Sequence, residues 1–267
     1  MKFACSTWMM PGDTFSEKIR NAKRYGFEGV EIRLFEEEAT KERIEEIKKA
    51  LVENDVKPVS LIMPGETYRK PLLSERDFED KVELSKKALN AAALFGCPTI
   101  VCPEYGAQIP LPLFDHPRRP DKNTYELLMK FLRTVSEYAK TAGTCAMIEP
   151  INRYETRFFY TLEDGVGVIK ESGADNIYLL ADFYHMGMEE KNVEEAIREY
   201  GKRIIHVHLG DSNRMLPGQG HTDFKPGFKA LEEIGYDRYM ALECSTKGNP
   251  EIVFPTCIEF LKNCCSK

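Results

Sequence analysis

Short β-rich runs alternate with amphipathic helical stretches along the whole chain, and this alternation most constrains the fold. Eight strands are expected, at Lys2–Trp8, Gly29–Leu34, Pro58–Ile62, Thr99–Cys102, Cys145–Glu149, Ile177–Asp182, Ile204–His208 and Tyr239–Glu243. The expected helices are Thr14–Tyr25, Thr40–Asn54, Ser74 to just before Gly96, a fourth ending near Ala142, Leu162–Glu171, Val193–Tyr200, Phe228–Ile234 and Ile252–Lys262. The strands are short and apolar, as buried parallel strands are.

Eight β-then-α units in 267 residues predict a single-domain (β/α)8 TIM barrel spanning residues 1–267, which is near the usual length of that fold. An open, doubly wound sheet is the alternative. We find no glycine-rich phosphate loop after the first strand, which such a dinucleotide-binding sheet would show. A loop with five prolines is expected over residues 103–121, before the fourth helix.

The charge and cysteine content exclude several classes of protein. The chain has 37 Lys and Arg against 43 Asp and Glu, without a basic stripe, so nucleic acid is not an expected partner. No apolar run approaches the roughly 18 residues that span a membrane. The eight cysteines contain no C-x-x-C pair, which favours reduced thiols and a cytoplasmic location over disulfides or a zinc site.

Four consecutive expected strands end in potential metal ligands. These residues are Glu149, Asp182, His208 and Glu243. The active site of such a barrel lies where its strands end, so the four side chains should share one rim. Taken singly, each carboxylate could instead cap a helix, and the histidine could be a hydrogen-bonded core residue. Their coincidence on successive strands favours one divalent cation, with Mn²⁺ expected first and Co²⁺ or Mg²⁺ as alternatives.

Further polar residues follow these strand ends. Glu155, His185 and Arg214 are expected in loops after the fifth, sixth and seventh strands, where they could bind a polyhydroxylated substrate or simply face solvent. His206 shares a strand face with His208 but lies deeper, so a supporting or packing role is expected rather than ligation.

The same stretches resemble the D-tagatose/D-psicose (allulose) 3-epimerase group of the xylose-isomerase-like sugar isomerases and epimerases. The matching motifs are Ile148-Glu-Pro-Ile-Asn-Arg-Tyr-Glu-Thr156, Asp182-Phe-Tyr-His185, His208-Leu-Gly-Asp-Ser-Asn-Arg214 and Pro217-Gly-Gln-Gly220, followed by Glu243. The resemblance is dense over residues 144–245 and only fold-like before residue 140.

The resemblance implies that Glu149, Asp182, His208 and Glu243 bind the metal, and that Glu149 and Glu243 also act as the acid and base. The remaining three residues named above, Glu155, His185 and Arg214, would bind the substrate near its carbonyl end. The implied reaction is inversion of C3 of a free ketose through an enediolate. The expected substrate is a small sugar, and the expected assembly is a homodimer or homotetramer. Two carboxylates suit this reaction, because a proton leaves one face of the carbon and returns on the other.

Two positions depart from the group. Members acting on free ketohexoses resemble one another in an aromatic residue two positions after the last glutamate, where this chain has Ser245. They also carry aromatics at the end of the first strand, where this chain has Ser6, Thr7 and then Trp8. The identity of the sugar is therefore left open by the sequence.

Three other functions compete with a ketose 3-epimerase. A metal-dependent aldose–ketose isomerase, acting on a related sugar or a hydroxypyruvate-like compound, would use the same enediolate. An apurinic endonuclease on a similar barrel is disfavoured, because the chain has only five histidines and an acidic balance. A non-catalytic metal-binding or sugar-binding protein is the third.

Overall fold

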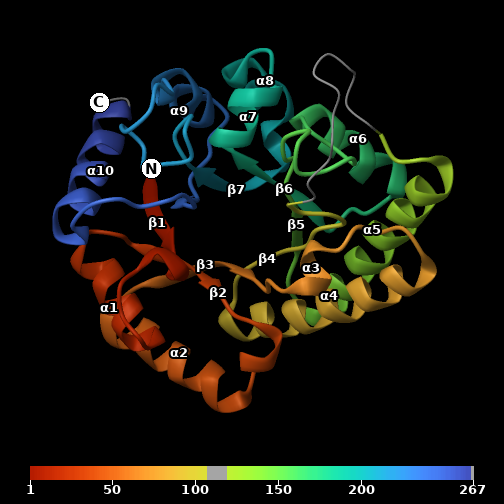
Figure 1. Ribbon diagram of the computed structural model, residues 1–267, viewed down its shortest axis with the longest axis horizontal. Coiled ribbons are helices and arrows are strands. Elements are labelled where there is room, and N and C mark those ends of the chain that lie inside the picture. The colour runs from red at the N-terminus through yellow and green to blue at the C-terminus, as the bar shows by residue number, and fades with distance from the viewer. Residues whose placement is uncertain (107–118, 266–267) are drawn as a thin grey trace.

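The computed structural model describes residues 1–106 and 119–265, and its strands form one closed parallel barrel in chain order (Figure 1). The strands are β1 (Lys2–Ser6), β2 (Gly29–Arg33), β3 (Lys57–Ile62), β4 (Thr99–Ile100), β5 (Ala146–Ile148), β6 (Ile177–Asp182), β7 (Ile204–Leu209) and β8 (Tyr239–Leu242). β1 pairs with both β2 and β8, which closes the barrel. The predicted (β/α)8 architecture is confirmed.

Helices surround the strands as an outer ring (Figure 1). They are α1 (Phe15–Arg24), α2 (Lys41–Asn54), α3 (Glu66–Arg69), α4 (Glu75–Phe95), α5 (Lys122–Ala142), α6 (Leu162–Ser172), α7 (Phe183–Glu189), α8 (Val193–Tyr200), α9 (Phe224–Glu233) and α10 (Pro250–Cys264). Among the described residues the chain also forms the single-turn 3₁₀ helices η1 (Thr7–Met9), η2 (Glu36–Glu38) and η3 (Gly201–Arg203). Local sequence fixes several helix ends: the side chains of Thr14, Ser74 and Thr161 accept hydrogen bonds from backbone N–H groups of α1, α4 and α6.

Several boundaries differ from those predicted. β1 ends at Ser6, because η1 takes the chain out of the barrel, and α9 begins at Phe224 rather than Phe228. The two short helices α3 and α7 were not predicted, since a helix of one or two turns carries little periodic signal. As a result His185, expected in a loop, lies in α7. Of the expected proline-rich loop, residues 107–118 lie outside the described residues.

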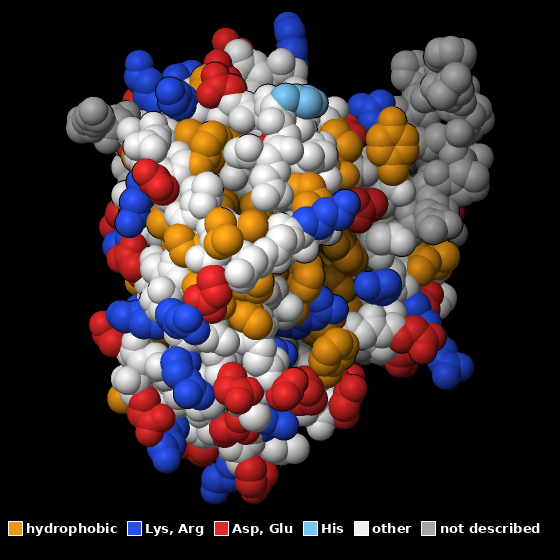
Figure 2. All heavy atoms as spheres, turned by 60° about the vertical axis from the view of Figure 1, so that its left-hand side comes forward, with side chains coloured by type: hydrophobic (Ala, Val, Ile, Leu, Met, Phe, Trp, Pro, Cys, Tyr) orange, Lys and Arg blue, Asp and Glu red, His pale blue; other side chains and the backbone are white. Residues whose placement is uncertain are grey.

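The cysteines are free thiols, as expected from their spacing. Across residues 1–106 and 119–265, no helix is long and apolar enough to cross a membrane. On the face in Figure 2, acidic and basic side chains are interspersed rather than gathered into one large basic patch.

Candidate active site

The four predicted metal ligands come together at the carboxyl end of the barrel. Glu149 directly follows β5, Asp182 ends β6, His208 lies near the end of β7, and Glu243 directly follows β8. One ligand atom from each residue lies within 4.8 Å of the others. The Nδ1 atom of His208 is 3.6 Å from Oε1 of Glu149 and 3.4 Å from Oε2 of Glu243. Neighbouring strands therefore bring these four side chains into one cluster.

The donor atoms of this cluster fit a divalent cation. Within the described part of the chain, Oε1 of Glu149 and Nδ1 of His208 are buried without a hydrogen-bond partner. A buried polar atom without a partner lowers the stability of the fold by about 1–3 kcal/mol. Binding of a cation by both atoms would remove this cost. In an octahedral site with bonds of about 2.1 Å, opposite donors lie about 4.2 Å apart, close to the spacing of the cluster. Three carboxylates and one imidazole are a hard donor set suited to Mn²⁺ or Mg²⁺.

The charge of the cluster is unbalanced without a cation. Burial raises the pKa of Glu149 to about 8 and also raises the pKa of Asp182. Burial alone would lower the pKa of His208, but the surrounding carboxylates, chiefly Glu31 and Glu243, raise it well above its usual value. A divalent cation bound at the cluster would favour the ionised carboxylates and the unprotonated nitrogen.

Asp182 also caps a helix. Its Oδ1 atom accepts a hydrogen bond of 2.7 Å from the backbone N–H of Tyr184, in the first turn of α7. Helix capping and membership of the cluster are therefore not alternatives for this carboxylate. The cap fixes the orientation of the side chain and leaves its other oxygen free for the cluster.

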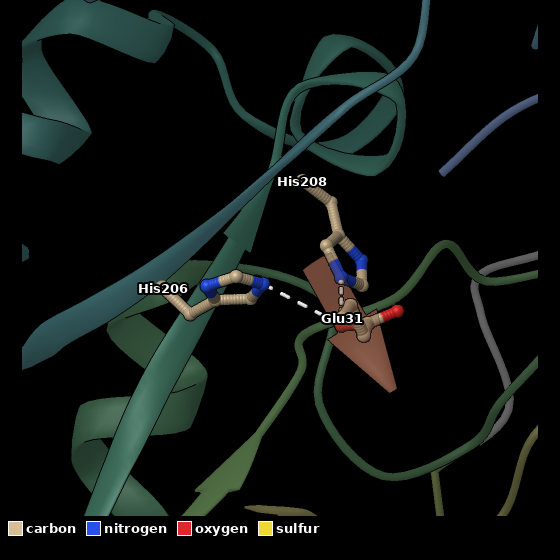
Figure 3. A group of neighbouring side chains, drawn as sticks. All are labelled: Glu31, His206 and His208. Atoms are coloured by element: carbon tan, nitrogen blue, oxygen red, sulfur yellow. Dashed lines mark hydrogen bonds and ion pairs between the residues drawn. The ribbon is translucent and has the colours of Figure 1, made fainter. Parts of the chain in front are cut away.

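A buried glutamate that was not predicted from the sequence holds His208 in place. Glu31, on β2, lies across the barrel from β7, and its Oε2 atom is 2.9 Å from Nε2 of His208 (Figure 3). Nε2–H donates to Glu31, which orients the ring so that Nδ1 faces Glu149 and Glu243; Nδ1 would give up its proton when a cation binds. In metal sites a carboxylate paired in this way with a histidine fixes the tautomer of the histidine and raises its basicity as a ligand.

Glu31 is itself held by a small polar network. Ser60 donates a hydrogen bond of 2.7 Å to Oε2 of Glu31, and Nε2 of His206 lies 3.4 Å from the same oxygen. Although burial opposes it, His208 and His206 hold the pKa of Glu31 well below its usual range. His206 thus lies beside Glu31 and outside the four-residue cluster. The signal for Glu31 in the sequence was an acidic residue between Val30 and Ile32 in a short strand.

His185 points an N–H group toward the cluster. Its Nδ1 atom accepts a hydrogen bond of 3.2 Å from the backbone N–H of Asn152, so the ring proton belongs on Nε2. Nε2 lies 3.8 Å from Asp182 and 4.0 Å from Glu149, and it has no hydrogen-bond partner in the described residues. Burial, with Arg214 second, lowers the pKa of His185 well below its usual value, which keeps the ring neutral. A neutral N–H donor is therefore directed into the site.

Glu155 and Arg214 form an ion pair beside the cluster, with 2.9 Å between Nη1 and Oε1. Arg214 also donates to the Tyr105 hydroxyl at 3.1 Å. The backbone of Arg214 has a φ of 58°, the left-handed region that a non-glycine residue enters at a cost. Asp211 holds this turn, because its carboxylate accepts hydrogen bonds from the backbone of Ser212, Gly218 and Thr222.

A cavity of about 200 Å³ opens beside the cluster. Of the predicted site residues, Glu149, Glu243 and Arg214 line it. Trp8, Arg33, Arg69 and Ser245 line other parts of its wall. A cavity of this size holds a small molecule such as a monosaccharide.

The family model described as "Xylose isomerase-like TIM barrel" matches residues 19–264. The chain belongs to this family. It is 29% identical over 252 residues to the 3-dehydro-D-guloside 4-epimerase of Escherichia coli (strain K12), a match that covers 93% of this chain and 94% of that protein. It is 36% identical over 124 residues to the L-ribulose 3-epimerase of Mesorhizobium japonicum, which covers 46% of this chain and 42% of that protein.

Solved structures show the same fold. The crystal structure of a 3-keto-D-glucoside 4-epimerase from E. coli superposes with a TM-score of 0.87 at 26% identity, covering 99% of this chain and all of that one. An L-ribulose 3-epimerase superposes with a TM-score of 0.85 at 21% identity, covering 99% of this chain and 94% of that one. The predicted resemblance is confirmed, and so is the prediction of a sugar isomerase or epimerase.

Proposed function

We propose that the chain is a metal-dependent ketose 3-epimerase, with Glu149 and Glu243 as its acid and base. The observation that carries this proposal is that both carboxylates line one cavity while each lies within 3.6 Å of the same unpaired nitrogen, Nδ1 of His208. A proton next to a carbonyl group is weakly acidic, so its removal needs a positioned base and a nearby positive charge. The cluster offers the carboxylates, and a divalent cation held there would supply the charge.

Each residue of the site has a separate task in this proposal. A divalent cation held by Glu149, Asp182, His208 and Glu243 would supply the positive charge that stabilises an enediolate. One glutamate takes the proton from C3, and the other returns a proton to the opposite face.

Hydrogen bonding to the substrate falls to the neighbouring side chains. The Nε2–H group of His185 donates to the carbonyl oxygen as negative charge develops on it. The ion pair of Arg214 and Glu155 binds hydroxyl groups near the same end. We expect Mn²⁺ as the metal and a homodimer or homotetramer as the assembly.

Inversion of C4 in a 3-keto sugar is the second candidate reaction. It is favoured by the match to the E. coli 4-epimerase, which extends over 94% of that protein. The chemistry is the same, because C4 adjoins a carbonyl at C3 as C3 adjoins a carbonyl at C2. An aldose–ketose isomerase would instead move a proton between C1 and C2.

Proton exchange in D₂O separates these reactions. The Mn²⁺-loaded protein is incubated with D-fructose, D-tagatose, L-ribulose and a methyl 3-keto-glucoside, and the exchange is followed by NMR. Deuterium at C3 of a ketose, together with the C3 epimer, supports the proposal. Deuterium at C4 of the 3-keto-glucoside alone supports the second candidate, and deuterium at C1 supports the isomerase.

A further inference from the structure

Two arginines of the cavity wall have no acidic partner among the residues that the structure describes. Arg33 ends β2 and is half-buried, and Arg69 ends α3 and is exposed. Within residues 1–106 and 119–265, neither guanidinium makes an ion pair or a side-chain hydrogen bond. An arginine that lines a cavity without a partner is suited to binding an anionic group of a ligand.

These arginines stand across the barrel mouth from the metal cluster. The strands follow one another in chain order around the barrel, so β2 and β3 lie opposite β6 and β7. The cluster lies at the ends of β5–β8. Arg33 is instead the last residue of β2, and Arg69 is the last residue of α3, which follows β3. A substrate held by its carbonyl end at the cluster therefore extends its other end toward the two arginines.

The described acidic residues of the cavity wall do not compensate Arg33 and Arg69. Glu149 and Glu243 belong to the cation cluster, and Arg214 pairs with Glu155. Arg33 and Arg69 therefore give the wall at the far end of the cavity positive charge.

Aromatic rings hold Arg33 in place. Its guanidinium carbon lies 5.8 Å from the ring centroid of Trp8 and 5.5 Å from that of Phe35. Both rings are partly exposed, so they leave the N–H edge of the guanidinium free to donate. Ser245 on the same wall is small and polar, which leaves room beside the arginine. This geometry restricts Arg33 before any ligand arrives, which lowers the entropic cost of binding.

We propose that the substrate carries a carboxylate or phosphate group at the end remote from its reacting carbon, and that Arg33 and Arg69 bind this group. The proposal deepens the proposed function, because it assumes a sugar whose carbonyl end meets the cluster. It replaces the free ketose expected from the sequence with an anionic one, and it applies equally to inversion at C3 or at C4.

Binding of three matched ligands tests this proposal without requiring turnover. D-Fructose, D-fructuronate and D-fructose 6-phosphate share carbons 1 to 5 and differ at C6. Each is titrated into the Mg²⁺-loaded protein while the fluorescence of Trp8, the single tryptophan of the chain, is followed. Because Trp8 contacts Arg33, its emission reports a ligand arriving at that guanidinium. Isothermal titration calorimetry gives the same dissociation constants independently.

We expect one of the two anionic ligands to bind at least about tenfold more tightly than D-fructose, since charged hydrogen bonds are about twice as strong as neutral ones. Arg33→Met and Arg69→Met should each weaken that anionic ligand by about tenfold and change the affinity for D-fructose less than twofold. Arg238→Met, an equal charge change just before β8 at the opposite end of the barrel, should change neither. Whether D-fructuronate or D-fructose 6-phosphate binds more tightly identifies the anion.

Equal affinity for all three ligands would overturn the proposal. So would a loss in the two arginine variants that is the same for D-fructose as for the anions. If the anions bind as expected but no carbon exchanges its proton in D₂O, the proposed reaction fails while the anion site stands. If D-fructose exchanges a proton and the anions bind no more tightly than D-fructose, the anion site fails while the proposed reaction stands.

Discussion

Replacing Glu31 should weaken metal binding, although Glu31 does not belong to the four-residue cluster. Its Oε2 atom lies 2.9 Å from Nε2 of His208 and receives a further hydrogen bond from Ser60. Loss of such a partner of a metal-binding histidine typically lowers affinity by about 10–100-fold, which equals about 1.4–2.7 kcal/mol. Glu31→Gln keeps an acceptor oxygen but loses the charge, so we expect about a tenfold loss. Glu31→Ala removes the acceptor as well, so His208 is no longer held in one tautomer and orientation, and we expect about a hundredfold loss of metal affinity.

The dissociation constant of Mn²⁺ is measured by calorimetry on metal-free wild type and on both variants, with circular dichroism to show that each is folded. Ser60→Ala is the matched control. It removes a hydrogen bond to the same carboxylate oxygen but leaves the contact between Glu31 and His208, so affinity should stay within about threefold. If folded Glu31→Ala binds Mn²⁺ within twofold of wild type, Glu31 does not position His208 and the reasoning is wrong.

Four further outcomes are expected. Glu149→Gln and Glu243→Gln should each retain less than about a tenth of the wild-type kcat with an unchanged circular dichroism spectrum, because a positioned acid or base contributes about 10²–10⁴ in rate. His185→Asn should lower kcat by about 10²-fold while the Mn²⁺ dissociation constant, measured by calorimetry, stays within about twofold. Lys81→Met should lower the urea-derived free energy of unfolding by about 1–3 kcal/mol, because the buried Lys81 ammonium donates to three backbone carbonyl oxygens, whereas Lys86→Met, at an exposed pair on the same helix, should change it by less than about 1 kcal/mol. Treatment with EDTA should abolish proton exchange in D₂O, and added Mn²⁺ should restore it; exchange that survives EDTA treatment would contradict a metal-dependent reaction.

The barrel could be predicted from the sequence because each of its strands is a short apolar run, followed by a helix with a clear apolar face. Boundaries were less predictable where tertiary contacts decide them. The strand expected over Thr99–Cys102 is only Thr99–Ile100, and α9 starts four residues before its expected position. α3 and α7 are one- or two-turn helices whose sequences lack a periodic pattern, so they emerge only when the chain packs on the barrel rim.

The meeting of Glu149, Asp182, His208 and Glu243 was predictable because one rule, that barrel strands end at the active site, selects one residue from each of four strands. The polar network that holds His208 could not be predicted from the sequence. Its central residue, Glu31, lies inside a strand, where a charged residue more often faces solvent, and only closure of the barrel brings it to His208 on β7. Likewise, Arg33 and Arg69 are two of 37 basic residues, and nothing in the sequence separates them from a solvated surface.

The alternation of β2 links the two halves of the site. Glu31 and Arg33 are two residues apart on one strand, so their side chains point to the same side of the sheet, Glu31 deep in the barrel and Arg33 at its mouth. Glu31 contacts His208, a proposed metal ligand, and Arg33 lines the cavity. Substitution of Glu31 should therefore weaken metal binding without changing which substrate is preferred. Substitution of Arg33 should change the preferred substrate without changing the affinity for the metal. Because the two side chains act through separate contacts, a variant with both substitutions should show the sum of the two single changes in the free energy of metal binding, and likewise in the free energy of substrate binding.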